Sequence, residues 1–232
     1  MSLDPINNRA YVPFSKQQSF CIVESTSGKL FPGVRVENVS FPLTISAIQA
    51  ACCNCLSEGE KPQTLYLDEK PYDQLDFWKA EFDLNVESTS KNIIEQLEDQ
   101  SKKTPEKELL RLKELLERAV PIHSEFPVSA LLYTDNGVFE GVNIEVSDWA
   151  MGLCAERVAI SKALANGYNS FSSLAVHTRY GEVSSPCGAC RQVIVEHLPL
   201  LKIRMHHSDD TLTEFFTNDL LPFSFTSNNL QK

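Results

Sequence analysis

The sequence predicts an α/β fold of two modules, each a mixed central sheet covered by helices. Three observations predict it: an internal repeat, alternating apolar segments that turn at glycines, and alanine-rich segments that end at a glycine. The chain has 232 residues, of which 42% are apolar. This is enough to build one large domain or two small ones.

The internal repeat occurs at an offset of 108 residues. In each half an apolar strand is followed by a glycine turn, and the chain returns as an alternating strand. The predicted first strands are residues 20–23 and 128–133, and the turns lie at Gly28 and Gly137. The matching residues are Phe31 and Phe139, Gly33-Val34 and Gly141-Val142, Glu37 and Glu145, and Gly59 and Gly167.

A helix and a further strand follow in each half. The predicted helices are rich in alanine, and a glycine, the residue that best tolerates a left-handed helix stop, ends each one. The repeat therefore predicts two modules of similar build. The predicted helices are 46–56 and 154–166, and the strands that follow are 64–67 and 174–178.

The segment between the halves, residues 90–117, is dense in Glu, Lys, Gln and Leu at helical spacing. Thr104-Pro105 interrupts it, so we predict two helices with a short break. The boundary is placed near residue 103. This gives an N-terminal module with linker, 1–102, and a C-terminal module, 103–232.

Composition limits the class of partner. The formal net charge is -10 and the sequence contains no basic run, which argues against a nucleic acid polymer and favours a small neutral or cationic ligand. No run of about 18 apolar residues is present, so we expect no membrane span and a cytoplasmic protein. Seven cysteines, an odd number, favour metal binding, catalysis or core packing over a disulfide framework.

Two short segments of the second half concentrate reactive side chains. Cys154-Ala155-Glu156-Arg157 begins one predicted helix, and Pro186-Cys187-Gly188-Ala189-Cys190-Arg191 begins another. Free amide hydrogens at a helix start favour the thiolate that zinc needs. Two such starts facing each other would supply three sulfurs to one Zn²⁺ ion and leave its fourth position open for water. This is the pattern of a catalytic zinc site.

The residues after Cys154 complete the predicted site. Glu156 can reach the zinc-bound water without being a ligand, and we expect it to carry protons. Because three thiolates against one dication leave a negative site, Arg157 is the candidate for charge compensation.

Other interpretations of these residues remain open. The three cysteines could form a structural zinc site with a histidine as fourth ligand. Cys52, Cys53 and Cys55 fall in an alanine-rich helix and are expected to be core residues. The candidate histidines are His177, His197, His206 and His207.

The two cysteine segments resemble the signature of the cytidine deaminase superfamily, in which a Cys or His before Ala-Glu is followed by Pro-Cys-x-x-Cys. The resemblance covers about the last 115 residues. It implies that Cys154, Cys187 and Cys190 bind Zn²⁺ and that Glu156 moves protons. The resemblance further implies substrate-binding roles for Asn143 and Glu145 at the ribose, for Phe126 at the pyrimidine ring and for the backbone around Ala155 at the base edge.

The substrate-binding roles have simpler alternatives. Asn143 and Glu145 could be only the polar face of an alternating strand, and Phe126 could be a core residue. Arg157 could be a solvated helix residue.

The N-terminal half resembles the same family but lacks its chemistry. Ser46-Ala47-Ile48 stands where Cys-Ala-Glu is expected, Arg35 replaces the asparagine, and no cysteine lies between Cys55 and Cys154. We therefore expect this half to be a degenerate module that does not catalyse.

The resemblance implies zinc-dependent hydrolytic deamination of cytidine and deoxycytidine to uridine and deoxyuridine, with release of ammonia, in pyrimidine salvage. It also implies a homodimer with four modules and two working pockets. The alternatives are deamination of a related aminopyrimidine nucleoside such as blasticidin S, or a scaffold protein that binds zinc only to fold.

Overall fold

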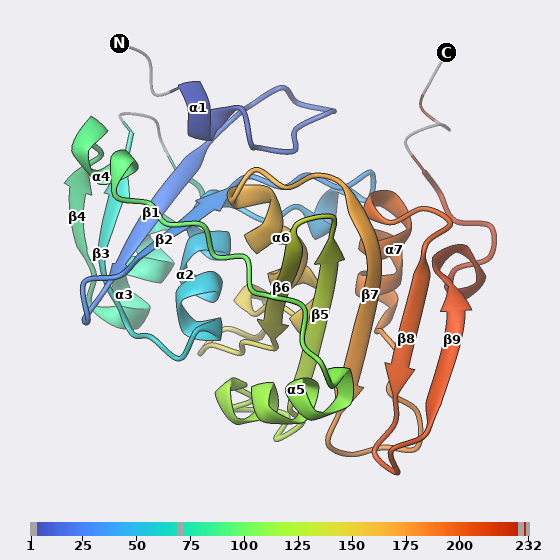
Figure 1. The fold of residues 1–232 in the computed structure, drawn as a ribbon. Coiled ribbons are helices and arrows are strands. Elements are labelled where there is room, and N and C mark those ends of the chain that lie inside the picture. The colour runs from blue at the N-terminus through green and yellow to red at the C-terminus, as the bar shows by residue number, and fades with distance from the viewer. Residues whose placement is uncertain (1–3, 69–71, 227–229, 231–232) are drawn as a thin grey trace.

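The chain forms two mixed β-sheets, one from each half, with helices packed against them (Figure 1). The computed structural model describes residues 4–68, 72–226 and 230. Strand order is β2-β1-β3-β4 in the first sheet and β6-β5-β7-β8-β9 in the second. The predicted α/β class, with two mixed sheets covered by helices, is confirmed.

The two halves share one strand topology. In each, the first two strands are antiparallel, and the third strand pairs antiparallel with the first and parallel with the fourth. The N-terminal half contains α1 (Asp4–Asn7), β1 (Phe20–Ser25), β2 (Leu30–Val34), α2 (Ala47–Ser57), β3 (Pro62–Leu67), α3 (Leu75–Phe82), β4 (Asn85–Ser88) and α4 (Lys91–Glu95). The C-terminal half contains α5 (Glu108–Leu115), β5 (Val128–Thr134), β6 (Gly137–Val142), α6 (Ala155–Ala165), β7 (Phe171–Thr178), α7 (Gly188–His197), β8 (Lys202–His206) and β9 (Leu212–Phe216).

Each half has one helix that lies directly on a strand backbone. A Cβ atom at Gly141 of β6 would overlap the carbonyl of Ala155 and the amide of Ala159, both in α6. A Cβ atom at Gly33 of β2 would overlap the backbone of Ala51 in α2 in the same way. Glycine at these repeat positions therefore allows the close approach of helix and strand.

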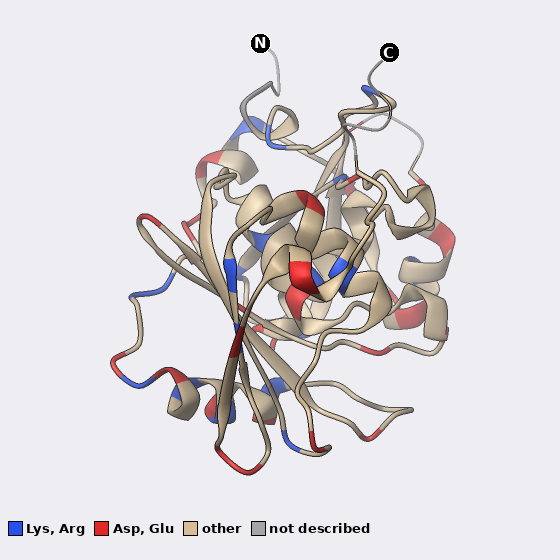
Figure 2. Ribbon diagram, turned by 90° about the vertical axis from the view of Figure 1, so that its right-hand side faces the viewer, with Lys and Arg blue, Asp and Glu red and all other residues tan. Residues whose placement is uncertain are grey.

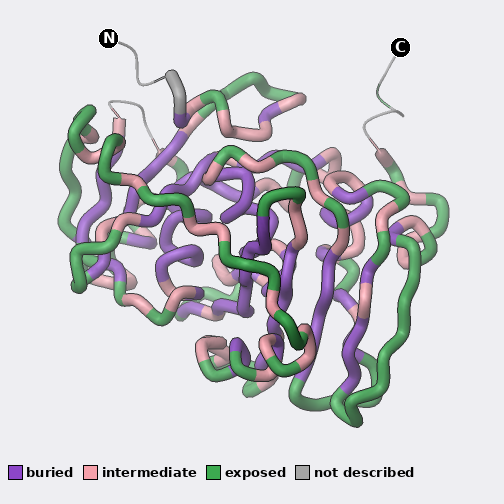
Figure 3. Tube along the Cα trace, in the orientation of Figure 1, coloured by how far each residue is buried: buried purple, intermediate pink, exposed green. Residues whose placement is uncertain are grey.

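The two halves are joined in one hydrophobic core. Helices α2 and α6 contact each other between the two sheets (Figure 1). Buried side chains from both halves belong to a single cluster, and the buried trace runs through both sheets and through these helices (Figure 3). The apolar faces of the two modules therefore cover each other.

A buried ion pair crosses the junction of the halves. Lys162 of α6 is fully buried, and its Nζ atom lies 2.5 Å from Glu58 Oε1, just after α2, and donates to the carbonyl of Glu140 at 2.8 Å. Burial alone would raise the pKa of Glu58, but the charge of Lys162 brings that pKa below its ordinary value. The charge of Lys162 therefore favours the ionised form of Glu58, whereas burial lowers the pKa of Lys162 itself.

The linker between the two halves differs from its prediction in the length of its non-helical part. The two helices expected over 90–117 form as α4 and α5, but the break between them is not short: residues 96–107 contain no helix. The Gln100 side chain accepts hydrogen bonds from Asn54 at 2.8 Å and Asn166 at 2.9 Å, and Lys102 forms a β-bridge with Val138. Contacts with both halves hold this segment extended and override its local helical preference.

Charged residues of both signs are interspersed along the ribbon in the view of Figure 2. Among the described residues, no helix is both long and apolar enough to cross a membrane.

Replacing Lys162 with Met should lower the free energy of unfolding by about 2 kcal/mol, because the largely buried carboxylate of Glu58 loses its closest cation and keeps Arg118, at 3.4 Å, and Lys102, at 3.9 Å. Lys91→Met is the matched control, since Lys91 pairs with Glu95 at 3.1 Å on the surface and should change stability little. Denaturant titration measures both variants. Equal, small losses would show that the buried pair does not stabilise the junction.

Candidate metal centre and active site

Three cysteine sulfurs converge where α6 and α7 begin. Cys154 is the N-cap of α6, Cys187 is the N-cap of α7, and Cys190 lies in the first turn of α7. Their Sγ atoms all lie within 4.8 Å of one another, and those of Cys154 and Cys187 are 3.8 Å apart. Sulfurs bound at about 2.3 Å to one tetrahedral zinc ion are about 3.8 Å apart, so the cluster fits this ion with one position left for a further ligand.

Hydrogen bonds within the cluster shift the pKa values of the three thiols in different directions. Those from Cys154 and Cys190 lower the pKa of Cys187, while the same contacts raise the pKa values of Cys154 and Cys190. The backbone amide of Cys190 also donates to Cys187 Sγ at 3.5 Å. These hydrogen bonds favour the thiolate form of Cys187, and binding of a dication would favour deprotonation of all three thiols.

Glu156 lies beside the sulfur cluster and is 2% exposed. Burial raises its pKa to about 7, although a hydrogen bond from the Cys190 thiol partly opposes this shift. A carboxyl group with this pKa can both take up and release a proton near neutral pH. The position and environment of Glu156 therefore suit proton transfer.

The site opens into a cavity of about 590 Å³. Ala155 and Cys190 do not line the cavity, and both are fully buried. Seven residues singled out from the sequence line it: Phe126, Asn143, Glu145, Cys154, Glu156, Arg157 and Cys187. The structure adds further lining residues that the sequence analysis missed, among them Ser124, Trp149, Val176, Thr178 and Ser185.

Asn143 and Glu145 are held by backbone groups on the cavity wall. Asn143 Oδ1 accepts from Val128 N at 2.8 Å, and its Nδ2 donates to Phe126 O at 3.0 Å, which leaves one amide hydrogen for a ligand. Glu145 accepts from the backbone amides of His123, at 2.8 Å, and Ser124, at 3.0 Å. Both residues therefore shape the wall and keep some hydrogen-bonding capacity.

Two aromatic side chains border the cavity. Phe126 is half-buried, and its ring centroid lies 6.3 Å from that of Tyr180. Trp149 is 67% exposed and forms an edge contact with His123. Trp149 was not predicted from the sequence as a site residue, although its counterpart at the repeat offset of 108 is also aromatic, Phe41, and each begins a 3-10 turn.

Arg157 reaches across to the other half of the molecule. Its Nη2 atom donates to the carbonyl of Leu43 at 2.9 Å. Its charge also lowers the pKa of Glu156, as a lesser influence than burial. The guanidinium group therefore contacts the N-terminal half while still acting electrostatically on the site.

The histidines considered as fourth ligands make other contacts. Within the described residues, the only group of close potential metal ligands consists of the three cysteines. His177 Nδ1 is 2.9 Å from His206 O, and His207 accepts from Ser184 N at 3.0 Å. Cys52, Cys53 and Cys55 are buried in α2, as expected of core residues.

The N-terminal half retains the framework of the site without its metal ligands. Ser46, the N-cap of α2, occupies the position equivalent to Cys154. Glu37 accepts from backbone amides of Phe14 and Ser15, both at 3.1 Å, as Glu145 does in the other half. Arg35 Nε lies 3.2 Å from Glu37 Oε1, so a cation contacts this carboxylate.

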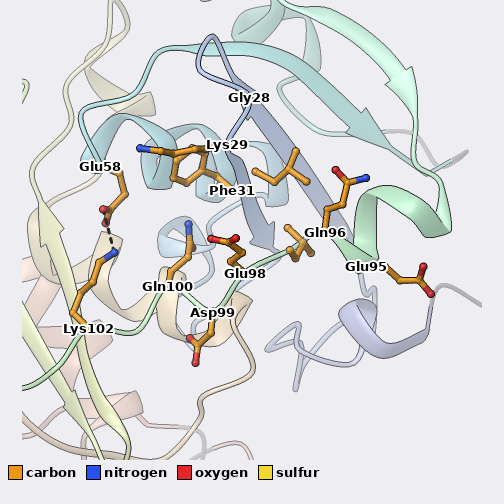
Figure 4. A pocket seen from close by; sticks show the side chains of 12 residues that line it. Gly28, Lys29, Phe31, Glu58, Glu95, Gln96, Glu98, Asp99, Gln100 and Lys102 are labelled. Atoms are coloured by element: carbon orange, nitrogen blue, oxygen red, sulfur yellow. Dashed lines mark ion pairs between the residues drawn. The ribbon is translucent and has the colours of Figure 1, made fainter.

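A second cavity, of about 650 Å³, lies in the N-terminal half beside the linker (Figure 4). Six of its twelve lining residues are charged, and Lys102 pairs with Glu58 at 3.9 Å. Its twelve lining residues include no cysteine or histidine. It is therefore a polar junction without the ligand set of the metal centre.

Comparisons with known proteins agree with this geometry. The family model that matches residues 102–200 is described as the cytidine and deoxycytidylate deaminase zinc-binding region. A cytidine deaminase of Sporosarcina psychrophila is 38% identical over 127 residues, which are 54% of this chain and 93% of the relative. The chain belongs to the cytidine deaminase family. The matched region contains all three clustered cysteines, and zinc is the metal of this centre.

Two further family members are similar over about half of the chain. A cytidine deaminase of Halalkalibacterium halodurans is 36% identical over 110 residues, which are 47% of this chain and 83% of the relative. The crystal structure of cytidine deaminase from Burkholderia pseudomallei is 37% identical and covers 49% of this chain and 93% of its own, with a TM-score of 0.47.

Replacing Cys187 with Ala should reduce bound zinc from about one ion per chain to nearly none, because the site loses one of its three sulfurs. Cys52→Ala and Cys55→Ala, which change buried thiols outside the cluster, should keep their zinc. Elemental analysis of the purified variants measures the ratio. Full zinc content in Cys187→Ala would contradict the assignment of this sulfur.

Proposed function

We propose that the chain catalyses hydrolytic deamination of cytidine and deoxycytidine to uridine and deoxyuridine, with release of ammonia, as a step of pyrimidine salvage. The convergence of three cysteine sulfurs beside the buried carboxyl group of Glu156, at one cavity, carries this proposal. Membership of the cytidine deaminase family supports it.

Cys154, Cys187 and Cys190 would hold the zinc ion, with Arg157 moderating the excess negative charge of three thiolates. When bound, zinc supplies a Lewis acid that lowers the pKa of a water molecule at its open position. Thiolates formed at helix N-termini are suited to this role, since backbone amides stabilise their charge.

Glu156 would move the protons of the reaction. It takes a proton from the attacking water, whose oxygen bonds to C4 of the pyrimidine, and delivers a proton to N3. It then takes the remaining proton from the hydroxyl group on C4 and passes it to the exocyclic amine, which leaves as ammonia when the C4–N bond breaks and the C4 carbonyl forms. Cytidine and water thus become uridine and ammonia. A pKa near 7 makes one carboxyl group able to perform each transfer.

The cavity wall would orient the nucleoside. The remaining amide hydrogen of Asn143 and the carboxylate of Glu145 would bind ribose hydroxyls, and Phe126 would pack against the pyrimidine ring. The backbone around Ala155, between Cys154 and Glu156, would read the base edge. The many apolar groups of the lining suit an uncharged base.

Replacing Glu156 with Gln should retain zinc and lower kcat by at least about 100-fold, because the amide cannot carry the proton. Ammonia release from cytidine and deoxycytidine measures the loss, and elemental analysis of the same sample confirms the metal. Glu87→Gln, a change at an exposed strand residue, is the control. Full activity of Glu156→Gln would refute its role, and turnover of neither nucleoside by the wild type would refute the proposed substrates.

We further propose that residues 1–102 form a non-catalytic module, that residues 103–232 form the catalytic one, and that two chains assemble as a homodimer. Two modules of one topology packed through α2 and α6 already form a pseudo-dimer within the chain. The seven cysteines are all free thiols, which suits a reducing compartment such as the cytoplasm.

The homodimer should sediment with twice the chain mass of 26.0 kDa at micromolar concentration. Analytical ultracentrifugation measures this directly. A single 26.0 kDa species with full activity would contradict the dimer while leaving the proposed reaction intact.

A further inference from the structure

Residues 146–153, here called the wall loop, form one side of the catalytic cavity. The loop contains the short 3-10 turn Trp149–Met151, and it joins Glu145 to Cys154. Its conformation therefore bears on both a proposed substrate contact and a metal ligand. Four of its residues line the cavity: Trp149, Ala150, Gly152 and Leu153.

The non-catalytic half holds the wall loop at two points. Glu81, on α3, accepts a hydrogen bond from the backbone amide of Ser147 at 2.9 Å and another from the Ser147 hydroxyl. Gln49, on α2, donates from Nε2 to the carbonyl of Met151 at 3.0 Å. These contacts lie on either side of Trp149, so the exposed part of the loop is restrained from both ends.

The catalytic half holds the corresponding loop of the other half, residues 38–45, in the same manner. Glu196, on α7, accepts from the backbone amide of Val39 at 2.9 Å, and Arg157, on α6, donates to the carbonyl of Leu43 at 2.9 Å. Both loop contacts fall at the repeat positions of those in the wall loop. Each half therefore holds the equivalent loop of the other half through hydrogen bonds, but of the two loops only the wall loop borders the metal centre.

We propose that Glu81 is a positioning residue of the catalytic site, supplied by the half that has lost its own chemistry. Its carboxylate fixes the wall loop, and with it Trp149, in the conformation that receives the nucleoside. This inference rests on the proposed function. It makes the N-terminal half a functional part of the catalytic pocket as well as a packing partner.

Replacing Glu81 with Ala should raise KM for cytidine roughly tenfold while kcat changes less than about twofold, because a restraint on the binding wall is lost and the proton carrier stays in place. Zinc content should be unchanged. Glu81→Gln keeps one acceptor oxygen and should give an intermediate KM. A fall in kcat at constant KM would overturn the proposal.

Glu196→Ala is the control, because it removes the equivalent contact from the loop that borders no metal centre. It also removes the acceptor of the Tyr11 hydroxyl, at 3.0 Å, and so loosens the junction at least as much as Glu81→Ala. Glu196 lies near the C-terminal end of α7, more than one turn beyond Cys190. This variant should leave KM unchanged. Equal increases of KM in both variants would show a general loosening of the junction and overturn the specific role of Glu81.

A second readout does not depend on turnover. The chain has two tryptophans, Trp78 and Trp149, so enzyme labelled with 5-fluorotryptophan should give two ¹⁹F resonances, which Trp149→Phe assigns. The Trp149 resonance should narrow in Glu81→Ala and not in Glu196→Ala, and an unchanged line width would overturn the proposal. Narrowing in a protein that never deaminates cytidine would support the restraint and reject only the proposed function.

Discussion

The contact of helix α6 with the backbone of strand β6 places the start of that helix, and the rest of the site depends on this placement. The contact is possible because Gly141 has no side chain. It brings Cys154 and Glu156, at the N-terminal end of α6, opposite the beginning of α7. A metal centre built from two helix starts needs this accuracy, since sulfur positions must match the short bonds of a zinc ion.

The N-terminal half has the same packing without the cysteines of the metal centre. Gly33 still lets α2 lie on β2, and Ser46 still caps α2 by accepting from Gln49 N at 3.2 Å. The local structure is therefore the same with Ser46 and Ile48 at the repeat positions of Cys154 and Glu156. The N-terminal half also packs against the C-terminal half, where Lys162 and Glu58 form an ion pair.

Much of the fold follows from local sequence patterns. Alternation, alanine-rich segments and glycine turns predicted the first three strands of each half and the helix before the third, but not α3, β4, β8 or β9. Gly33 and Gly141 recur at the repeat distance, and the structure shows that each allows a helix contact. The cysteine spacing predicted a cluster that the structure brings together. These features are encoded within a few residues of one another, or at a fixed repeat distance.

Features that depend on distant contacts could not be predicted in this way. The linker looks helical, but Gln100 and Lys102 are held by side chains and backbone of both halves. Trp149 borders the cavity because contacts from the other half restrain its loop, which no local pattern reveals. Ser124, which supports Glu145, had a weak signal: it follows Val120-Pro121, the repeat counterpart of Val12-Pro13.

The β-bridge between Lys102 and Val138 protects the edge of the C-terminal sheet from aggregation, and it crosses the module boundary predicted near residue 103. Strand β6 is at the edge of its sheet, and the amide and carbonyl of Val138 are bound by the backbone of Lys102, at 2.9 and 2.8 Å. The linker thus shields a backbone edge that could otherwise recruit a strand from another molecule. A fragment that begins at residue 103 would lack Lys102 and would expose the backbone edge of β6. The module boundary predicted from the sequence therefore leaves a sheet edge unprotected in the C-terminal module alone.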